Sequence, residues 1–155
     1  MILAPVKPIV IDTNVCLDLF VFRDPRWAEL VAALESGEVL AVTRADCRDE
    51  YLAVLHYPHL PLDAASRLEA AARFDQLLKV VAPDARHVRL PVCTDRDDQK
   101  FLELARDAGA EVLVTKDKAL LKLNRRTVKD GLFKIMVPEA WLKARANTKD
   151  TTALK

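Results

Sequence analysis

Two short apolar runs, each leading to an aspartate, constrain the fold of this chain more than any other feature. Ile9–Ile11 runs directly into Asp12, and Val112–Val114 leads through a two-residue spacer to Asp117. Runs of this kind are typical of strands that are buried on both faces of a parallel sheet. Open parallel sheets bind ligands at the carboxyl ends of their strands. If the two strands are neighbours, we expect Asp12 and Asp117 to share one edge of the sheet.

Two aspartates at such an edge favour a metal site. Their carboxylates repel each other and raise each other's pKa unless a cation lies between them. A hard divalent cation, which prefers oxygen ligands, relieves that repulsion. The sequence therefore predicts a divalent metal site around Asp12 and Asp117.

The rest of the pattern predicts an α/β fold. Apolar residues at helical spacing alternate with short strand-like runs, which favours a parallel sheet with right-handed crossovers. We expect a three-layer α/β/α sandwich with a central, mostly parallel sheet. Further strands are predicted at residues 39–42 and 134–137, and helices at residues 15–20, 25–36, 44–56, 63–78, 98–108 and from 138 onward.

Capping residues and the tail set the expected boundaries. Thr43 and Asp97 are predicted to cap the helices that follow them, since both residue types accept hydrogen bonds from the first turn. Neither a linker nor an internal repeat is visible, so we expect a single domain over residues 1–145. Residues 146–155 are polar and are predicted to form a frayed tail.

Composition limits the partners and the compartment. With 24 basic and 23 acidic residues, the chain has no overall field that attracts nucleic acid, so a polyanion requires a local basic patch. Cys16, Cys47 and Cys93 are an odd number without a CxxC pair, which fits a reducing cytosol better than disulfides or a zinc site. No run approaches the roughly 20 apolar residues of a membrane span. We expect a soluble, cytoplasmic protein without a membrane partner.

Two further acids occupy positions that face the core. Glu50 is spaced as a helical neighbour of Cys47 and Val54, and Asp98 as a neighbour of Phe101. An unpaired charge facing a core costs several kcal/mol, so these positions require a cation or a strong partner. Together with the two strand-end aspartates, they predict four carboxylates that converge on one edge.

Each of these acids also has a purely structural explanation. Asp98 suits the first turn of a helix, where the dipole favours an acid. Asp117 suits the cap of the turn that follows it, and Glu50 could pair with Arg44 or Arg48. Asp12 is the hardest to explain in this way, because nothing in the helix after it calls for a charge.

Three polar neighbours are candidates for orienting the carboxylates. Thr13, Asn14 and Thr115 carry hydroxyl or amide groups that can hold an acid without adding charge. A helix cap is an equally good explanation for Asn14, and Thr115 has the same two interpretations. His56 and His59 lie in or beside a proline-bounded loop at a spacing that could bind a metal. Histidines in loops are more often simply solvated, so we do not expect a metal role for them.

Four motifs in this order resemble the PIN-domain family, and within it the toxin components of toxin–antitoxin pairs. They are IVIDTNV at residues 9–15, DEYLAVLHYP at 49–58, DRDDQKFLELA at 95–105 and AEVLVTKDKALL at 110–121. Each motif alone is a weak signal, but four at compatible spacing are a strong one. The resemblance covers nearly the whole chain.

The resemblance implies a catalytic set and a metal. In that family, acids matching Asp12, Glu50, Asp98 and Asp117 hold Mg²⁺ or Mn²⁺ and hydrolyse RNA phosphodiesters. Asp95 lies in the same motif and is a candidate outer ligand. The chain departs from the pattern before Asp117, where many relatives have a glycine and this sequence has a lysine, whose Cβ restricts the backbone of the turn.

The chemistry expected from this set is metal-assisted attack of water on a phosphodiester, which leaves a 5′-phosphate and a 3′-hydroxyl. Single-stranded RNA is the expected substrate, since no element for reading a groove is visible. The candidate RNA contacts are the basic residues that follow the acidic edge, namely Lys116, Lys118, Lys122, Arg125, Arg126 and Lys129. The alternative is that these residues only form a solvated face of the protein.

Partners and rival functions complete the expectations. The resemblance implies an antitoxin protein as partner, and the apolar residues Trp27, Leu60 and Leu62 are candidates for a homodimer face. A non-catalytic PIN-like interaction module is the main alternative. A phosphatase of the haloacid dehalogenase type is disfavoured, because its general acid would stand where this chain has Asn14.

Overall fold

The computed structural model describes residues 7–82 and 88–153, with side chains described as far as residue 147. In these residues the chain forms a five-stranded sheet of order β3-β2-β1-β4-β5, in which every neighbouring pair is parallel. The first and fourth strands are neighbours, which is the condition for the expected shared edge, with Ile11 opposite Val114. The strands are β1 (Ile9–Ile11), β2 (Ala41–Thr43), β3 (Leu78–Val80), β4 (Val112–Val114) and β5 (Lys134–Met136).

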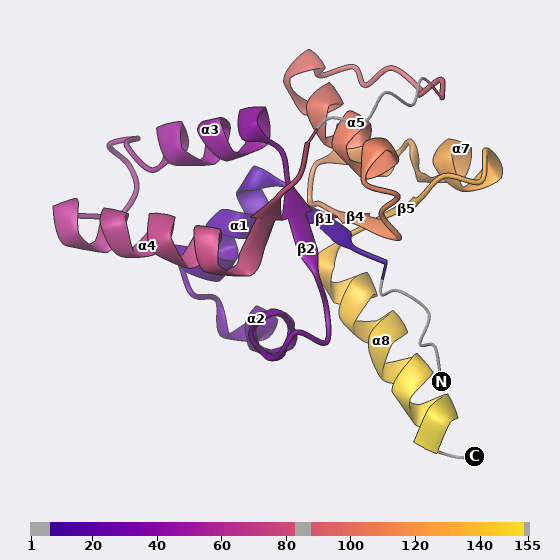
Figure 1. Cartoon of the computed structure of the whole chain (residues 1–155), viewed down its shortest axis with the longest axis horizontal. Helices are drawn as coiled ribbons and strands as arrows, with labels where there is room; N and C mark the ends of the chain where they lie inside the picture. The colour runs from indigo at the N-terminus through magenta and orange to yellow at the C-terminus, as the bar shows by residue number, and fades with distance from the viewer. Residues whose placement is uncertain (1–6, 83–87, 154–155) are drawn as a thin grey trace.

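Helices cover both faces of this sheet, so the three-layer α/β/α architecture is confirmed (Figure 1). At least one helix lies between each pair of consecutive strands along the chain, as expected for parallel crossovers. Their bounds are α1 (Thr13–Phe20), η1 (Pro25–Trp27), α2 (Ala28–Ser36), α3 (Ala45–Val54), α4 (Ala64–Leu77), η2 (Arg96–Asp98), α5 (Gln99–Asp107), α6 (Lys118–Leu121), α7 (Asn124–Lys129) and α8 (Pro138–Ala153), where η denotes a 3₁₀ turn.

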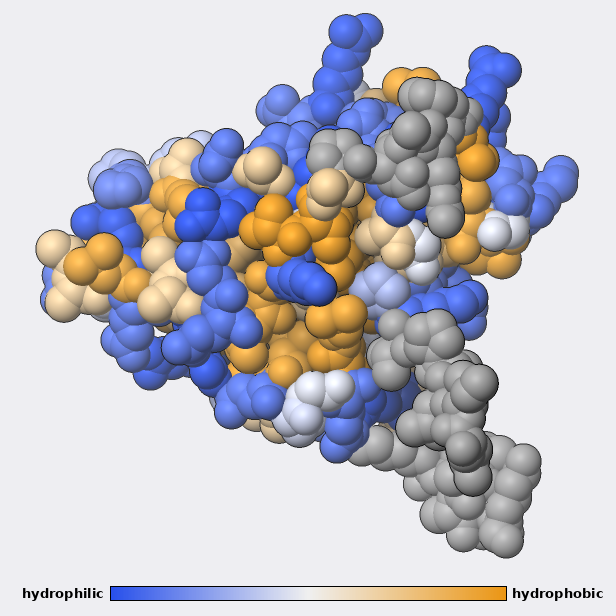
Figure 2. Space-filling view, viewed as in Figure 1, coloured by the Kyte–Doolittle hydropathy of each residue, from blue (hydrophilic) through white to orange (hydrophobic). Residues whose placement is uncertain are grey.

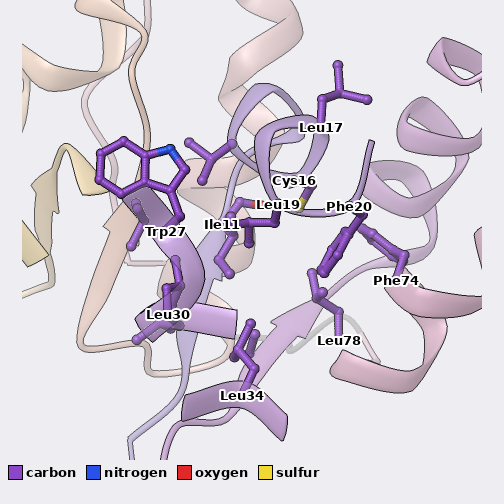
Figure 3. Packing of buried hydrophobic residues seen from close by; sticks show 14 of the residues in the cluster. Ile11, Cys16, Leu17, Leu19, Phe20, Trp27, Leu30, Leu34, Phe74 and Leu78 are labelled. Carbon is purple, nitrogen blue, oxygen red and sulfur yellow. Dashed lines mark hydrogen bonds between the residues drawn. The ribbon is translucent and has the colours of Figure 1, made fainter. Parts of the chain in front are cut away.

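The alternation of side chains along the strands divides the core in two. Ile9 and Ile11 point toward α1, α2, α4 and α8, whereas Val10 points toward α5 and α6. On the first face, Phe20 packs edge-on against Phe74 at 6.4 Å between ring centroids, and Leu78 lies beside them (Figure 3). Burial on both faces explains why β1 and β4 read as continuous apolar runs.

Two predicted caps are wrong for the same kind of reason. Thr43 is buried as the last residue of β2, and α3 begins after Arg44 without a side-chain cap. Asp95 replaces Asp97 as a cap, because the segment begins with the 3₁₀ turn η2, and the Asp95 carboxylate accepts from the Asp97 N–H at 3.1 Å. The first helical turn begins one residue later than the apolar spacing indicates for α3, and the η2 turn begins two residues earlier than it indicates for α5.

The residues proposed for a homodimer face are not exposed. Trp27 is 2% exposed and Leu60 is 7% exposed, and both belong to the core, with Leu62 packed against it. Apolar surface gathers instead near the β3 edge on the face seen in Figure 2, where Val80 is 49% exposed. Trp27 and Leu60 are therefore wrong as dimer contacts, whereas Leu62 is half-buried.

The C-terminal part differs from the expected frayed tail. The backbone of α8 continues from Pro138 to Ala153, beyond residue 146 where the sequence predicts that order ends.

His87 lies outside the described residues. Within the part of the chain that the structure describes, no helix has the length and apolar content required to cross a membrane.

Candidate metal site

Asp12 follows β1 and is held in place from both sides. Its Oδ1 accepts a hydrogen bond from the Val15 N–H at 3.0 Å, which makes it the cap of α1, and Thr115 donates its hydroxyl to Oδ2. The residue is only 4% exposed. Burial raises the pKa of Asp12 to about 6, the two hydrogen bonds partly offset this effect, and the charge of Asp117 adds to it. The capping role explains why an aspartate stands at position 12, but it does not explain why the Asp12 carboxylate is buried away from water.

Asp117 is joined to the same threonine from the other strand. The fully buried Thr115 hydroxyl accepts from the Asp117 N–H at 3.0 Å while it donates to Asp12. The Asp117 carboxylate accepts from the Ala119 N–H at 2.7 Å and caps α6, as its structural explanation predicts. Thr115 thus connects the ends of β1 and β4 through one hydroxyl.

The lysine before Asp117 does not distort this turn. Among the described residues other than glycine, only Arg23 has a positive φ, at 49°. Lys116 therefore adopts an ordinary backbone conformation, and the turn delivers Asp117 without needing the glycine of many relatives. The Lys116 ammonium lies 2.5 Å from Oδ2 of Asp18 on α1.

Three aspartates form a group of carboxylates at this edge. One oxygen from each of Asp95, Asp98 and Asp117 lies within 4.8 Å of the other two. Oδ2 of Asp98 is buried and has no hydrogen-bond partner among the described residues. Burial and the neighbouring acids, Asp117 first and then Asp95 and Asp12, raise the pKa of Asp98, while the hydrogen bond with Asp98 lowers the pKa of Asp117. Asp98 is thus the member of the pair that is more easily protonated.

This group has the properties that a divalent ion requires. Its donors are carboxylate oxygens, the ligands of Mg²⁺ and Mn²⁺ in proteins. The buried, unpartnered Oδ2 of Asp98 is a polar atom whose desolvation a cation would compensate. Asp95, Asp98 and Asp117 could hold such an ion, with the buried carboxylate of Asp12 interacting with the same charges. Sequence reasoning underestimated Asp95, which both caps η2 and belongs to the group.

Glu50 lies outside this group of three. Its Oε2 accepts a hydrogen bond from the Thr13 hydroxyl at 2.6 Å, and its Oε1 lies 3.3 Å from the Lys100 ammonium. The pairing with Arg44 or Arg48 is not found, because both arginines bind other carboxylates. Thr13 thus holds an acid, as expected.

Lys100 is a residue of the site that sequence reasoning missed. It lies in the first turn of α5, where the helix dipole disfavours a cation. A lysine in the first turn of a helix is therefore a signal in the sequence that an acid lies near its ammonium. Asn14, in contrast, is exposed on the first turn of α1, and Asp12 has the capping role considered for it.

The candidate RNA contacts lie on the surface beyond the acids. Lys118, Arg125 and Arg126 are exposed, and none of them forms an ion pair with another described residue. Lys116 differs from them, since its ammonium is already paired with Asp18. Lys118 opens α6 directly after Asp117, and both arginines lie on α7, the next helix along the chain.

A family comparison covers this whole arrangement. Residues 8–119 match the model of the PIN domain, a range that includes Asp12, Glu50, Asp98 and Asp117 and runs from β1 into α6. PIN domains are generally metal-dependent nucleases. No curated protein matches the chain. The match spans more than half of the sequence and the fold agrees with it, so the chain belongs to the PIN-domain family.

Proposed function

We propose that this protein is a metal-dependent endoribonuclease that hydrolyses RNA phosphodiester bonds with Mg²⁺ or Mn²⁺. The observation that supports it most is the group formed by Asp95, Asp98 and Asp117 beside the buried Asp12, with one Asp98 oxygen left without a partner. A divalent ion bound there would lower the pKa of an attacking water and offset charge on the leaving oxygen.

The protein groups would divide the work as follows. Asp95, Asp98 and Asp117 would supply oxygens to the ion, with Asp12, which lies outside that group, as a further proposed ligand and Glu50 as the acid at the margin of the site. Thr115 fixes the orientation of Asp12. A carboxylate that is already in place does not have to reorient when charge develops in the transition state. We assign no catalytic role to histidine, and water as the attacking group gives products with a 5′-phosphate and a 3′-hydroxyl.

Single-stranded RNA is the substrate that we propose. Lys118, Arg125 and Arg126 would contact its phosphates, because their charges are exposed and are not neutralised by described acids. Lys116 is a weaker candidate, since its charge is balanced by Asp18. We further propose that the protein acts in the cytoplasm as the toxin of a type II pair with an antitoxin partner, which rests on the resemblance of its four motifs.

The alternative is a PIN-like interaction module without catalysis. It predicts that the acids bind at most a structural ion and that RNA remains intact. The phosphatase alternative has little support, because the chain belongs to the PIN-domain family and Asn14 offers no carboxylate at the position of the general acid.

Cleavage of a mixed RNA pool tests the proposal. We expect cleavage by the full chain with Mn²⁺ or Mg²⁺, none with a chelator, and a loss of at least about 100-fold in Asp12→Asn and Asp98→Asn. Asp49→Asn is the matched control, since Asp49 is exposed and adjacent to Glu50 in the chain. Equal activity in wild type and Asp12→Asn, or no cleavage by either, would leave the interaction module as the better explanation.

A further inference from the structure

Lys100 is fixed by three contacts beside the acidic site. Its ammonium lies 3.3 Å from Oε1 of Glu50, donates to the carbonyl oxygen of Asp97, and lies 5.3 Å from the ring centroid of Phe101. Its side chain is only 18% exposed. A lysine held in this way differs from a solvated surface lysine, because its charge is fixed toward the site.

Glu50 is correspondingly occupied on both oxygens. Thr13 donates to Oε2, and the Lys100 ammonium neutralises Oε1. This explains how a half-buried glutamate is accommodated near four aspartates without joining the group of Asp95, Asp98 and Asp117. Lys100 thus places a cation, held by Glu50, beside the carboxylates that are the proposed metal ligands.

We propose that Lys100 is a positioning residue that holds Glu50 at the margin of the site and thereby sets its affinity for a divalent ion. This inference rests on the proposed function, because it assumes that the aspartates bind Mg²⁺ or Mn²⁺. Removal of the ammonium makes the site more negative and releases an oxygen of Glu50 toward the ion. Both effects strengthen the binding of a dication.

A second role for Lys100 predicts a different result. If the ammonium serves only to contact an RNA phosphate, its loss weakens RNA binding and leaves the affinity for Mn²⁺ unchanged. The contacts favour the first role, since the ammonium is already bound by Glu50 and by the Asp97 carbonyl and is largely shielded from solvent.

Titration of the RNA-free full chain with Mn²⁺, followed by calorimetry or by the electron paramagnetic resonance signal of free Mn²⁺, tests the proposal. We expect Lys100→Gln to lower the Kd for Mn²⁺ by roughly 3- to 10-fold. Lys100→Arg should retain the Kd of the wild type, because it keeps the charge. Lys143→Gln makes the same charge change at an exposed position of α8 and should have no effect.

A double-mutant cycle shows whether Lys100 acts through Glu50. In the Glu50→Gln background, the effect of Lys100→Gln on the Kd should be clearly smaller, because only the direct charge effect of the ammonium on the ion remains. An undiminished effect in that background would show that Lys100 does not act through Glu50 and would overturn the proposal. Circular dichroism and thermal unfolding of each variant establish that it is folded. Lys100→Met, which also removes the charge but keeps the length of the side chain, replaces Lys100→Gln if that variant does not fold.

Failure of this inference is distinguishable from failure of the proposed function. If the wild type binds no Mn²⁺, the proposed nuclease site is wrong and the inference falls with it. If the wild type binds Mn²⁺ and Lys100→Gln binds it equally or more weakly, only the role assigned to Lys100 is overturned.

Discussion

The hydroxyl of Thr115 donates a hydrogen bond to the carboxylate of Asp12, although 103 positions separate the two residues. Both lie directly after paired strands, Asp12 after β1 and Thr115 after β4. The same hydroxyl accepts from the Asp117 N–H, so one threonine fixes the geometry of both aspartates. This arrangement makes Thr115 the residue through which the two strand ends are most directly coupled.

Substitution of Thr115 by valine should therefore affect both stability and metal binding. Valine has a similar shape but removes the partner of the Asp117 N–H and the donor to Oδ2 of Asp12, which should lower the free energy of unfolding by about 1–3 kcal/mol. Urea denaturation measures this change, and a Mn²⁺ titration should show weaker binding. Thr43→Val at the end of β2 is the control, since the Thr43 hydroxyl makes only one long bond of 3.5 Å; an equal loss there would contradict the role of Thr115.

Asp12→Asn should stabilise the metal-free protein while it removes activity. The pKa of Asp12 is about 6 in the fold against an ordinary 3.8, so the folded protein binds more protons than the unfolded chain between these values. The contribution of Asp12 to the free energy of unfolding therefore falls as the pH rises through this range. We expect Asp12→Asn to exceed the wild type by roughly 1–3 kcal/mol at pH 8 and by much less near pH 4.

Urea denaturation at both pH values, with a chelator present, provides the measurement. Asp49→Asn is an exposed control in which the difference from wild type should stay within about 0.5 kcal/mol. If the wild type is more stable than Asp12→Asn at pH 8 without metal, the buried charge of Asp12 does not destabilise the folded protein and the prediction is wrong.

Mn²⁺ should raise the stability of the wild type, and more so at higher pH. An ion that binds only the folded state adds about 2.7 kcal/mol to the free energy of unfolding at 100 times its Kd. Protons compete for Asp12 and Asp98, whose pKa values are both raised, so the affinity for Mn²⁺ should increase as the pH rises from about 5 to about 8. Thermal unfolding at several Mn²⁺ concentrations checks this, and Asp98→Asn should lose most of the shift.

Arg125→Gln and Arg126→Gln should weaken RNA binding without changing the metal site. Each exposed guanidinium that contacts a phosphate contributes to the salt dependence, so the slope of log affinity against log salt should decrease by about 0.7 per residue for a single strand. Fluorescence anisotropy with a labelled single-stranded RNA in Ca²⁺ or without metal measures binding apart from cleavage. Lys143→Gln should leave the slope unchanged, and unchanged slopes in the arginine variants would place the RNA elsewhere.

Much of the fold could be predicted from local pattern. Burial on both faces requires apolar residues at every position of β1 and β4, so Ile9–Ile11 and Val112–Val114 were recognisable as strands. Gly37 ends α2 with φ at 80°, a conformation that glycine adopts without cost. Where a 3₁₀ turn precedes a helix, as η2 precedes α5, the apolar spacing does not show the true first residue. The spacing therefore predicts Asp97 as the cap, whereas Asp95 has that role.

The surface assignments were less predictable, because burial depends on what packs over a residue. Trp27 and Leu60 look like candidates for an interface in the sequence, but α2 and the loop after α3 place them in the core. Lys116 looks like a free basic residue, and only the packing of α1 against the β4–α6 turn shows that Asp18 neutralises it.

The amino-acid sequence by itself determined that Asp12 and Asp117 end two buried strands, because a strand that is covered on both faces leaves its signature in consecutive residues. Only the tertiary structure decided the partners of these acids. It brought Asp95 and Asp98 to Asp117, placed Thr115 against Asp12, and paired Glu50 with Lys100. These contacts join segments that are distant in the chain, and their distances depend on helix starts and side-chain packing that no local pattern records.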